Sequence, residues 1–135
     1  MKISILLSDR RFKINKRALK ALVGNVLTKE FSTRCKVDII YCDDREITRL
    51  NREYKHKKRS TDVMAFNLSD NEMPDYLGEV YVNLQMARRQ ARENNVSYFE
   101  EVKRLTIHGV LHLLGYRDET KINRRKMWNQ QESYL

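Results

Sequence analysis

The chain has 135 residues, of which 41% are hydrophobic and 33% charged, a composition typical of a folded domain and not of a disordered protein. No apolar run approaches the ~20 residues of a membrane-spanning helix, the first residues do not form a signal peptide, and two cysteines are too few for a disulfide framework; we therefore expect a cytoplasmic protein without a membrane partner. The net charge of +9 favours a polyanionic partner such as nucleic acid, although a solvated basic surface would have the same composition.

Hydrophobic periodicity predicts four strands and five helices. Short apolar runs predict strands over residues 3–7, 37–41, 62–66 and 77–82. Apolar residues at helical spacing predict helices over about 14–27, 43–54, 84–93, 97–114 and 122–131. The polar segment 67–75 holds the only proline and is expected to be a surface loop. The order of elements predicts an α+β fold, a single domain over residues 1–135 with a four-stranded mixed sheet covered by about five helices.

Local signals define three of the helix ends. Asp43 and Glu46 have the spacing of a capping box, and so do Ser97 and Glu100. Gly115 stands where a residue with positive φ is expected just past a helix end. The helix between Ser97 and Gly115 is the most apolar of the five, so we expect it at the centre of the fold.

Basic residues concentrate in two segments. Residues 10–29 contain seven Lys and Arg and no Asp or Glu, and residues 55–59 read KHKKR in an expected loop. Clustered cations attract the phosphates of nucleic acids. Charge alone leaves two alternatives open, nucleic-acid binding and a solubilising surface.

A pair of histidines in the central helix indicates a metal site. His108 and His112 are four residues apart, which places both imidazoles on one helical face about one turn apart. Gly115 then ends the helix, so the chain can turn and bring Asp118 back toward the pair. Two imidazoles and a carboxylate would bind one divalent cation and leave a coordination position for water. We therefore expect the metal site on the central helix and the following turn.

Other interpretations of the histidine pair stay open. Such pairs also occur on surfaces or as satisfied core residues, but burying two imidazoles without partners among Leu, Ile and Val would be costly. Gly109 stands where zinc peptidases of the HExxH type carry their general base, which counts against that chemistry. Two His and one carboxylate occur at zinc and at non-haem iron sites, so the ligands do not identify the metal.

The same segment resembles a family signature. Residues 108–118, HGVLHLLGYRD, resemble the HGxLHLxGYxH signature of the YbeY family, bacterial endoribonucleases that mature ribosomal RNA. LNREY at 50–54 and TDVMAF at 61–66 are similar to the family's LNxxYR and TDVLSF block, and LGEV at 77–80 is similar to its LGDI. The matches span about residues 44–128 in the same order. The resemblance implies a metal-dependent endoribonuclease that cuts single-stranded RNA in ribosomal RNA maturation and ribosome quality control, with small-subunit ribosomal proteins as further partners.

The chain departs from the family pattern at two positions. Asp118 replaces the usual third histidine, which makes a bound metal one charge less positive and its water a weaker acid. We expect one divalent ion, Zn²⁺ in the first place, with Mn²⁺, Fe²⁺ or Ni²⁺ as alternatives. Lys55 stands where the family commonly has Arg, which keeps the charge but loses bidentate phosphate binding.

The resemblance also implies roles for individual residues. His108 and His112 are expected to be catalytic as metal ligands, and Lys55 is expected to offset charge on the phosphate. The RNA-binding residues implied are Lys55, Lys57, Lys58 and Arg59.

Several neighbours of the motif have weaker claims to a role. Asp62 is a candidate general base, although an Asp that opens a strand is more often structural. Thr61 fits a turn-capping hydroxyl better than a substrate contact. Glu101 and Arg104 fall on the histidine face by helical periodicity, and Tyr116 is expected to pack beside the site.

Two other functions remain as alternatives. A non-catalytic RNA-binding assembly factor, with a structural metal site, would have the same basic surface. A metallohydrolase acting on a substrate other than RNA would have the same ligands. An assay of RNA binding and cleavage by metal-replete protein separates these cases.

Overall fold

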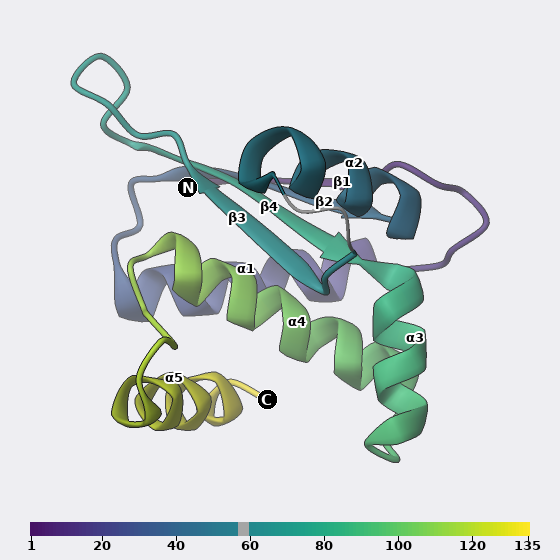
Figure 1. The fold of residues 1–135 in the computed structure, drawn as a ribbon. Helices are drawn as coiled ribbons and strands as arrows, with labels where there is room; N and C mark the ends of the chain where they lie inside the picture. The colour runs from purple at the N-terminus through teal and green to yellow at the C-terminus, as the bar shows by residue number, and fades with distance from the viewer. Residues whose placement is uncertain (57–59) are drawn as a thin grey trace.

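The computed structural model describes residues 1–56 and 60–135 and folds them into a four-stranded sheet and five helices (Figure 1). In chain order the elements are β1 (Lys2–Leu7), α1 (Lys16–Glu30), β2 (Lys36–Cys42), α2 (Asp44–Lys55), β3 (Val63–Asn67), β4 (Tyr76–Asn83), α3 (Leu84–Glu93), α4 (Tyr98–Leu113) and α5 (Lys121–Ser133). The α+β class and the predicted order of elements are confirmed, with boundaries that differ by at most three residues. Within the described residues, no helix combines the length and the apolar character that crossing a membrane requires.

The sheet has the order β1-β2-β4-β3. β1 pairs with β2 and β2 pairs with β4 in parallel, whereas β3 pairs with β4 in the antiparallel direction. The predicted mixed sheet is therefore confirmed. Helix α1 makes the crossover that the parallel pair β1 and β2 requires. The antiparallel strand β3 lies at the edge of the sheet, in contact with α4.

Side-chain caps start the helices where the sequence predicts. The carboxylate of Asp43 accepts a hydrogen bond of 2.9 Å from the backbone amide of Glu46 and starts α2. The hydroxyl of Ser97 accepts one of 3.1 Å from the amide of Glu100 and starts α4. Each cap satisfies one of the amides that a first helical turn leaves without a partner.

Helices cover both faces of the sheet (Figure 1). Helices α1 and α4 lie against one face and enclose the larger apolar core, whose central members include Leu19, Val23, Ile39, Val80 and Val110. Helix α2 lies on the opposite face over a smaller cluster formed by Cys42, Ile47, Leu50 and Met64. Helix α4 also contacts α3 and α5, so it occupies the central place expected from its apolar sequence.

The position of α4 on the sheet is set by a close approach at Gly109. A Cβ atom at this position would collide with the side chain of Val80 and would lie 2.7 Å from Cγ1 of Val63. Residue 109 therefore faces β3 and β4 directly. At about 100° per residue, His108 and His112 then project together from one flank of the helix. The sheet fixes the rotation of α4 and with it the direction of both imidazoles.

Candidate metal centre

The structure brings together the three residues expected to bind a metal, named the metal cluster below: His108, His112 and Asp118. Oδ2 of Asp118 lies 3.3 Å from Nε2 of His112 and 4.0 Å from Nε2 of His108. The two imidazole rings meet edge to face, with centroids 4.6 Å apart. One potential ligand atom from each residue lies within 4.8 Å of the others, so the group could hold a metal ion.

Gly115 makes the turn that returns Asp118 to the helix. Its φ of +103° is one that residues with a Cβ rarely adopt. The amide of Gly115 bonds the carbonyl of His112 at 3.0 Å, and the amide of Tyr116 bonds the carbonyl of Leu111 at 3.0 Å. These bonds close the end of α4, as the glycine in the sequence predicts.

Both histidines have one ring nitrogen engaged by an oxygen. Nδ1 of His112 lies 3.1 Å from the carbonyl oxygen of Tyr116, and Nδ1 of His108 lies 2.7 Å from Oε1 of Gln131. The amide nitrogen of Gln131 donates to Glu132 at 3.2 Å, which fixes its oxygen toward His108. Because both oxygens can only accept, each Nδ1 carries a hydrogen, and in a neutral imidazole Nε2 is then the nitrogen with the lone pair, directed toward Asp118.

The electrostatics of the metal cluster favour a cation. Burial lowers the pKa of His108, which favours its neutral, ligating form. Nε2 of each histidine and the carboxylate of Asp118 converge on one space, where a cation would be attracted to the carboxylate and to any imidazole lone pair. The side chains are 28%, 29% and 44% exposed for His108, His112 and Asp118, so an ion can reach them from solvent.

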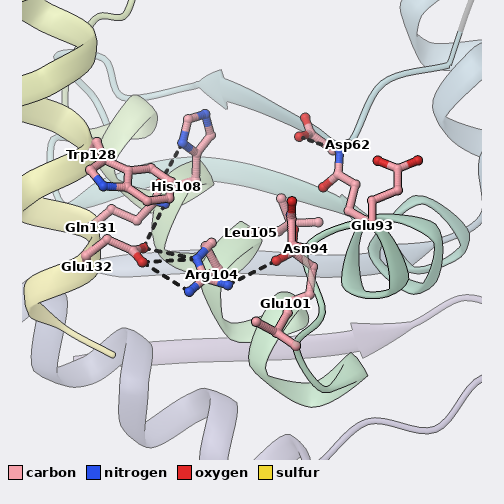
Figure 2. Close-up of a pocket in the computed structure, with 12 residues that line it drawn as sticks. Asp62, Glu93, Asn94, Glu101, Arg104, Leu105, His108, Trp128, Gln131 and Glu132 are labelled. Carbon is pink, nitrogen blue, oxygen red and sulfur yellow. Dashed lines mark hydrogen bonds and ion pairs between the residues drawn. The ribbon is translucent and has the colours of Figure 1, made fainter.

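A chain of polar contacts supports His108 from α5 (Figure 2). The guanidinium of Arg104 pairs with Glu101 at 3.1 Å and with Glu132 at 3.0 Å. Glu132 in turn accepts from Gln131, whose oxygen meets His108. The sequence places Glu101 and Arg104 on the histidine face of α4, and in the structure they are mostly buried partners in this chain of contacts.

A cleft opens on each side of the metal cluster. The His112 cleft has a volume of about 350 Å³ and is lined by Asn51, Lys55, Thr61, Val63, Met64, Ala65 and His112. The His108 cleft has a volume of about 660 Å³ and is lined by residues of α3, α4 and α5 together with Asp62. The two imidazoles therefore stand between two solvent-filled spaces of different composition.

The structure places the other predicted site residues with different results. Lys55 is exposed at the end of α2 and lines the His112 cleft together with His112. Asp62 lines the His108 cleft and accepts a hydrogen bond of 3.4 Å from Gln90. Tyr116 contributes its backbone carbonyl to His112, while its hydroxyl donates to Glu30. Lys57, Lys58 and Arg59, predicted to bind RNA, lie outside the described residues.

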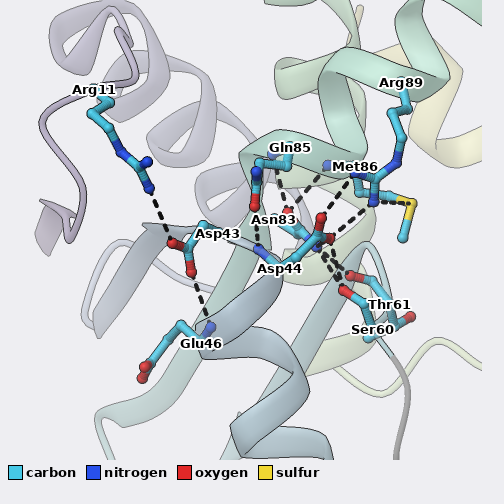
Figure 3. Close-up of polar contacts among 10 residues, drawn as sticks. All are labelled: Arg11, Asp43, Asp44, Glu46, Ser60, Thr61, Asn83, Gln85, Met86 and Arg89. Carbon is cyan, nitrogen blue, oxygen red and sulfur yellow. Dashed lines mark hydrogen bonds and ion pairs between the residues drawn. The ribbon is translucent and has the colours of Figure 1, made fainter.

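A second polar cluster, named the Asn83 network, fixes the start of β3 (Figure 3). Nδ2 of the fully buried Asn83 lies 2.7 Å from a carboxylate oxygen of Asp44, 2.9 Å from Oγ of Ser60 and 3.0 Å from the carbonyl of Thr61. Arg89 donates two further bonds of 2.9 Å to Asp44. The hydrogen bonds from Arg89, with those from Asn83 and Ser60, lower the pKa of Asp44 to about 2. The network therefore holds Thr61 at the wall of the His112 cleft.

Sequence reasoning missed the contribution of α5. Gln131 and Trp128 line the His108 cleft, and neither belongs to the motif around the histidines. A signal for Gln131 is present in the sequence, because a glutamine four residues after the core residue Met127 falls on the buried face of a helix. A buried amide at such a position needs a polar partner.

Comparison with known proteins gives a consistent result. The family model described as Endoribonuclease YbeY matches residues 4–135. An endoribonuclease YbeY from Carboxydothermus hydrogenoformans is 46% identical over 94 residues, which cover 67% of this chain and 66% of that protein. One from Aquifex aeolicus is 34% identical over 133 residues, which cover 97% and 88% of the two chains.

A solved structure shares the fold. The solution structure of a Thermotoga maritima protein superposes with a TM-score of 0.68 at 29% sequence identity. The superposition covers 98% of this chain and 85% of the other. The likeness supports the arrangement of sheet and helices described above.

Proposed function

The chain belongs to the YbeY endoribonuclease family, and from this premise we propose that it is a metal-dependent enzyme that cuts single-stranded ribosomal RNA during ribosome maturation and quality control. The observation that carries the proposal is the convergence of the two Nε2 atoms and the Asp118 carboxylate on one point, with both Nδ1 atoms held by oxygens. The reaction takes place in the cytoplasm, near small-subunit ribosomal proteins.

His108, His112 and Asp118 would hold one divalent ion. Two neutral imidazoles and a carboxylate fit Zn²⁺, which we expect first; the carboxylate also suits Mn²⁺, Fe²⁺ and Ni²⁺. When bound, the ion supplies Lewis-acid polarisation of a phosphoryl oxygen and lowers the pKa of a coordinated water. With the third ligand an aspartate, the positive charge left for the substrate is one unit smaller than at a site of three histidines.

Lys55 would bind the substrate phosphate. Lys55 and His112 line the same cleft, which supports a role in which the Lys55 ammonium group would offset the charge that builds on the phosphate during cleavage. As a point charge it positions phosphate less strictly than the planar guanidinium of an arginine. Lys57, Lys58 and Arg59 would extend this positive surface along the RNA backbone.

Cleavage of a labelled RNA by metal-replete protein tests the proposal. We expect products from a single-stranded RNA, fewer from the same RNA annealed to its complement, and none above background from His112→Ala. His56→Asn is the matched control, because it removes the third histidine and keeps a residue that tolerates the positive φ of position 56.

The same assay separates the alternatives. Binding of RNA by the wild type without any products would contradict the proposal and favour a non-catalytic assembly factor. Hydrolysis of a small ester substrate that competing RNA does not reduce would favour a metallohydrolase of another class.

A further inference from the structure

We propose that the His108 cleft is a nucleobase-binding subsite in which Trp128 stacks on an unpaired base next to the scissile phosphate. This inference rests on the proposed function and adds to it the part of the RNA that lies on the far side of the metal cluster from Lys55. It assigns a substrate contact to α5, which lies outside the sequence motif.

Trp128, the only tryptophan of the chain, is exposed to solvent at the edge of the His108 cleft. Its side chain is 53% exposed, whereas its neighbour Met127 on α5 is 1% exposed in the core. Trp128 lines the His108 cleft together with His108, and it lines a smaller adjoining cavity of about 240 Å³ with His108 and Asp118. The exposed indole therefore adjoins two of the three residues of the metal cluster.

The opposite wall of the His108 cleft is acidic. Figure 2 shows Asp62 and Glu93 across the cleft from Trp128. Among the described residues that line the cleft, Arg104 is the single Lys or Arg, and it is paired with Glu101 and Glu132. A phosphate would be repelled from this space, whereas an uncharged base would not.

The walls of the His108 cleft offer partners for both the face and the edge of a nucleobase. An indole offers an aromatic face on which any nucleobase can stack. Carboxylates such as those of Asp62 and Glu93 accept hydrogen bonds from the amino and imino groups on a base edge. A base in a duplex is already stacked and paired, so only an unpaired base can enter. The cleft would therefore select single-stranded RNA.

The two clefts would then divide the substrate between them. The His112 cleft carries Lys55 and receives phosphate, and the His108 cleft carries Trp128 and receives a base. The metal cluster lies between them, where a phosphodiester linking two nucleotides would lie. Stacking on Trp128 would position the RNA strand relative to the metal cluster. The uncharged indole would not change the electrostatic attraction of the phosphate to Lys55.

Binding of two oligonucleotide probes tests this inference. The first is a short single-stranded DNA, and the second is a strand of the same length in which every residue is abasic. Zinc-loaded wild type, Trp128→Ala and Trp128→Phe are compared by fluorescence anisotropy. Ile122→Ala is the matched control, because it removes another apolar side chain of α5 that is 70% exposed. The intrinsic fluorescence of the wild type reports directly on Trp128, the only indole present.

We expect the base-bearing probe to quench Trp128 fluorescence and the abasic probe to leave it unchanged. Trp128→Ala should weaken binding of the base-bearing probe by roughly 10- to 100-fold, the range expected for one stacked base, and Trp128→Phe should recover much of this loss. Binding of the abasic probe, zinc content and the salt dependence of binding should be the same in all variants.

Equal affinity of wild type and Trp128→Ala for the base-bearing probe would overturn the inference, and so would equal quenching by both probes. If Trp128→Ala does not fold, the comparison of Trp128 quenching by the two probes in the wild type still tests the inference. Neither measurement depends on cleavage. A wild type that shows base-dependent quenching but does not cut RNA contradicts the proposed function alone, and one that cuts RNA while Trp128→Ala binds normally contradicts the subsite alone.

Discussion

The metal cluster and the Asn83 network each contain one aspartate carboxylate, but they surround it in opposite ways. In the Asn83 network, the carboxylate of Asp44 accepts hydrogen bonds from Asn83, Ser60 and Arg89, so acceptors meet donors. In the metal cluster, the carboxylate of Asp118 faces two ring nitrogens whose hydrogens lie on the other side of each ring. The carboxylate of the first cluster has its donors within the protein, whereas the second is arranged so that it could hold a cation.

This difference distinguishes a structural cluster from a binding site. The network joins α2, the segment before β3, β4 and α3, so its hydrogen bonds contribute to the free energy of folding. The members of the metal cluster instead direct their Nε2 atoms and carboxylate toward one another, and a bound ion would join them by coordination. Substitutions in the two places should therefore have separate consequences, the network for stability and the metal cluster for binding and catalysis.

The largest expected effect is on metal binding by His108→Ala. Loss of a ligand should raise the dissociation constant for zinc by more than ~100-fold, above the 10- to 100-fold typical of residues that only support a ligand. RNA cleavage should fall to background. Elemental analysis of protein purified without added metal measures the loss of bound metal, and His56→Asn should retain the wild-type metal content. Wild-type metal content in His108→Ala would show that the metal cluster does not bind the metal.

The next largest effect is on stability, for Asn83→Ala. Removing this side chain takes a cap from α3 and leaves the partly buried Ser60 and Asp44 each with one donor fewer, which should cost about 2–4 kcal/mol in the free energy of unfolding. Urea denaturation measures it, with Asn25→Ala on the exposed side of α1 as the control. Metal content should stay at the wild-type value, and a loss of metal without a loss of stability would reverse the roles assigned to the two clusters.

A smaller effect is expected for Gln131→Leu, which should weaken zinc binding by about 10- to 100-fold. The substitution removes the oxygen that holds Nδ1 of His108 and so frees the ring to rotate or to change tautomer. Competition with a chelating dye measures the affinity. Asn129→Leu, on the exposed side of α5, is the control. Unchanged affinity would mean that the contact packs α5 without orienting the ligand.

Asp118→His should change metal preference more than metal content. A third imidazole in place of a carboxylate should shift the ratio of zinc to manganese affinity toward zinc by about tenfold, because imidazole is the softer ligand. Asp118→Ala should lower the affinity for both ions. Equal affinities in all three proteins would show that Asp118 does not take part in binding.

The smallest effect is a pH dependence of stability that belongs to the Asn83 network. The pKa of Asp44 is lowered to about 2 in the folded protein, below the ~3.9 of an unfolded chain. Its contribution is therefore complete above the unfolded pKa and is lost as the pH falls through the folded value, with a size of under ~1 kcal/mol for this partly exposed group. Asp44→Asn should flatten the stability of the protein between pH 4 and 2 in acid titration. An unchanged acid limb would contradict the assignment.

Local sequence patterns predicted much of the fold and the position of the metal cluster. Periodicity and caps predicted the nine elements, and the spacing of His108, His112 and Gly115 predicted that the two histidines and Asp118 come together. These features depend on dihedral angles and hydrogen bonds within a few residues, which the sequence encodes directly. The order β1-β2-β4-β3 has no such signature, because it depends on how distant strands pair.

Contacts between distant elements explain the rest. Asn83 stands at the start of a predicted helix, so a cap could be expected there, but its contact with Asp44 requires the register of the sheet. Gln131 meets His108 because of the way α5 packs across α4, which no spacing along the chain reveals. Trp128 reaches the cleft for the same reason. The contacts that other elements make with the site are therefore the part that the sequence does not predict.

The tight contact at Gly109 limits the routes by which this fold could evolve a new activity. A side chain at position 109 must displace Val63 and Val80 or lift α4 from the sheet, and either change would misdirect both imidazoles. The single replacement that would bring a peptidase-like glutamate into the motif therefore destroys the ligand geometry it would need. Laboratory evolution toward other hydrolytic reactions has to recruit its proton acceptor from another element, and Asp62, on the wall of the His108 cleft, is the position from which to start.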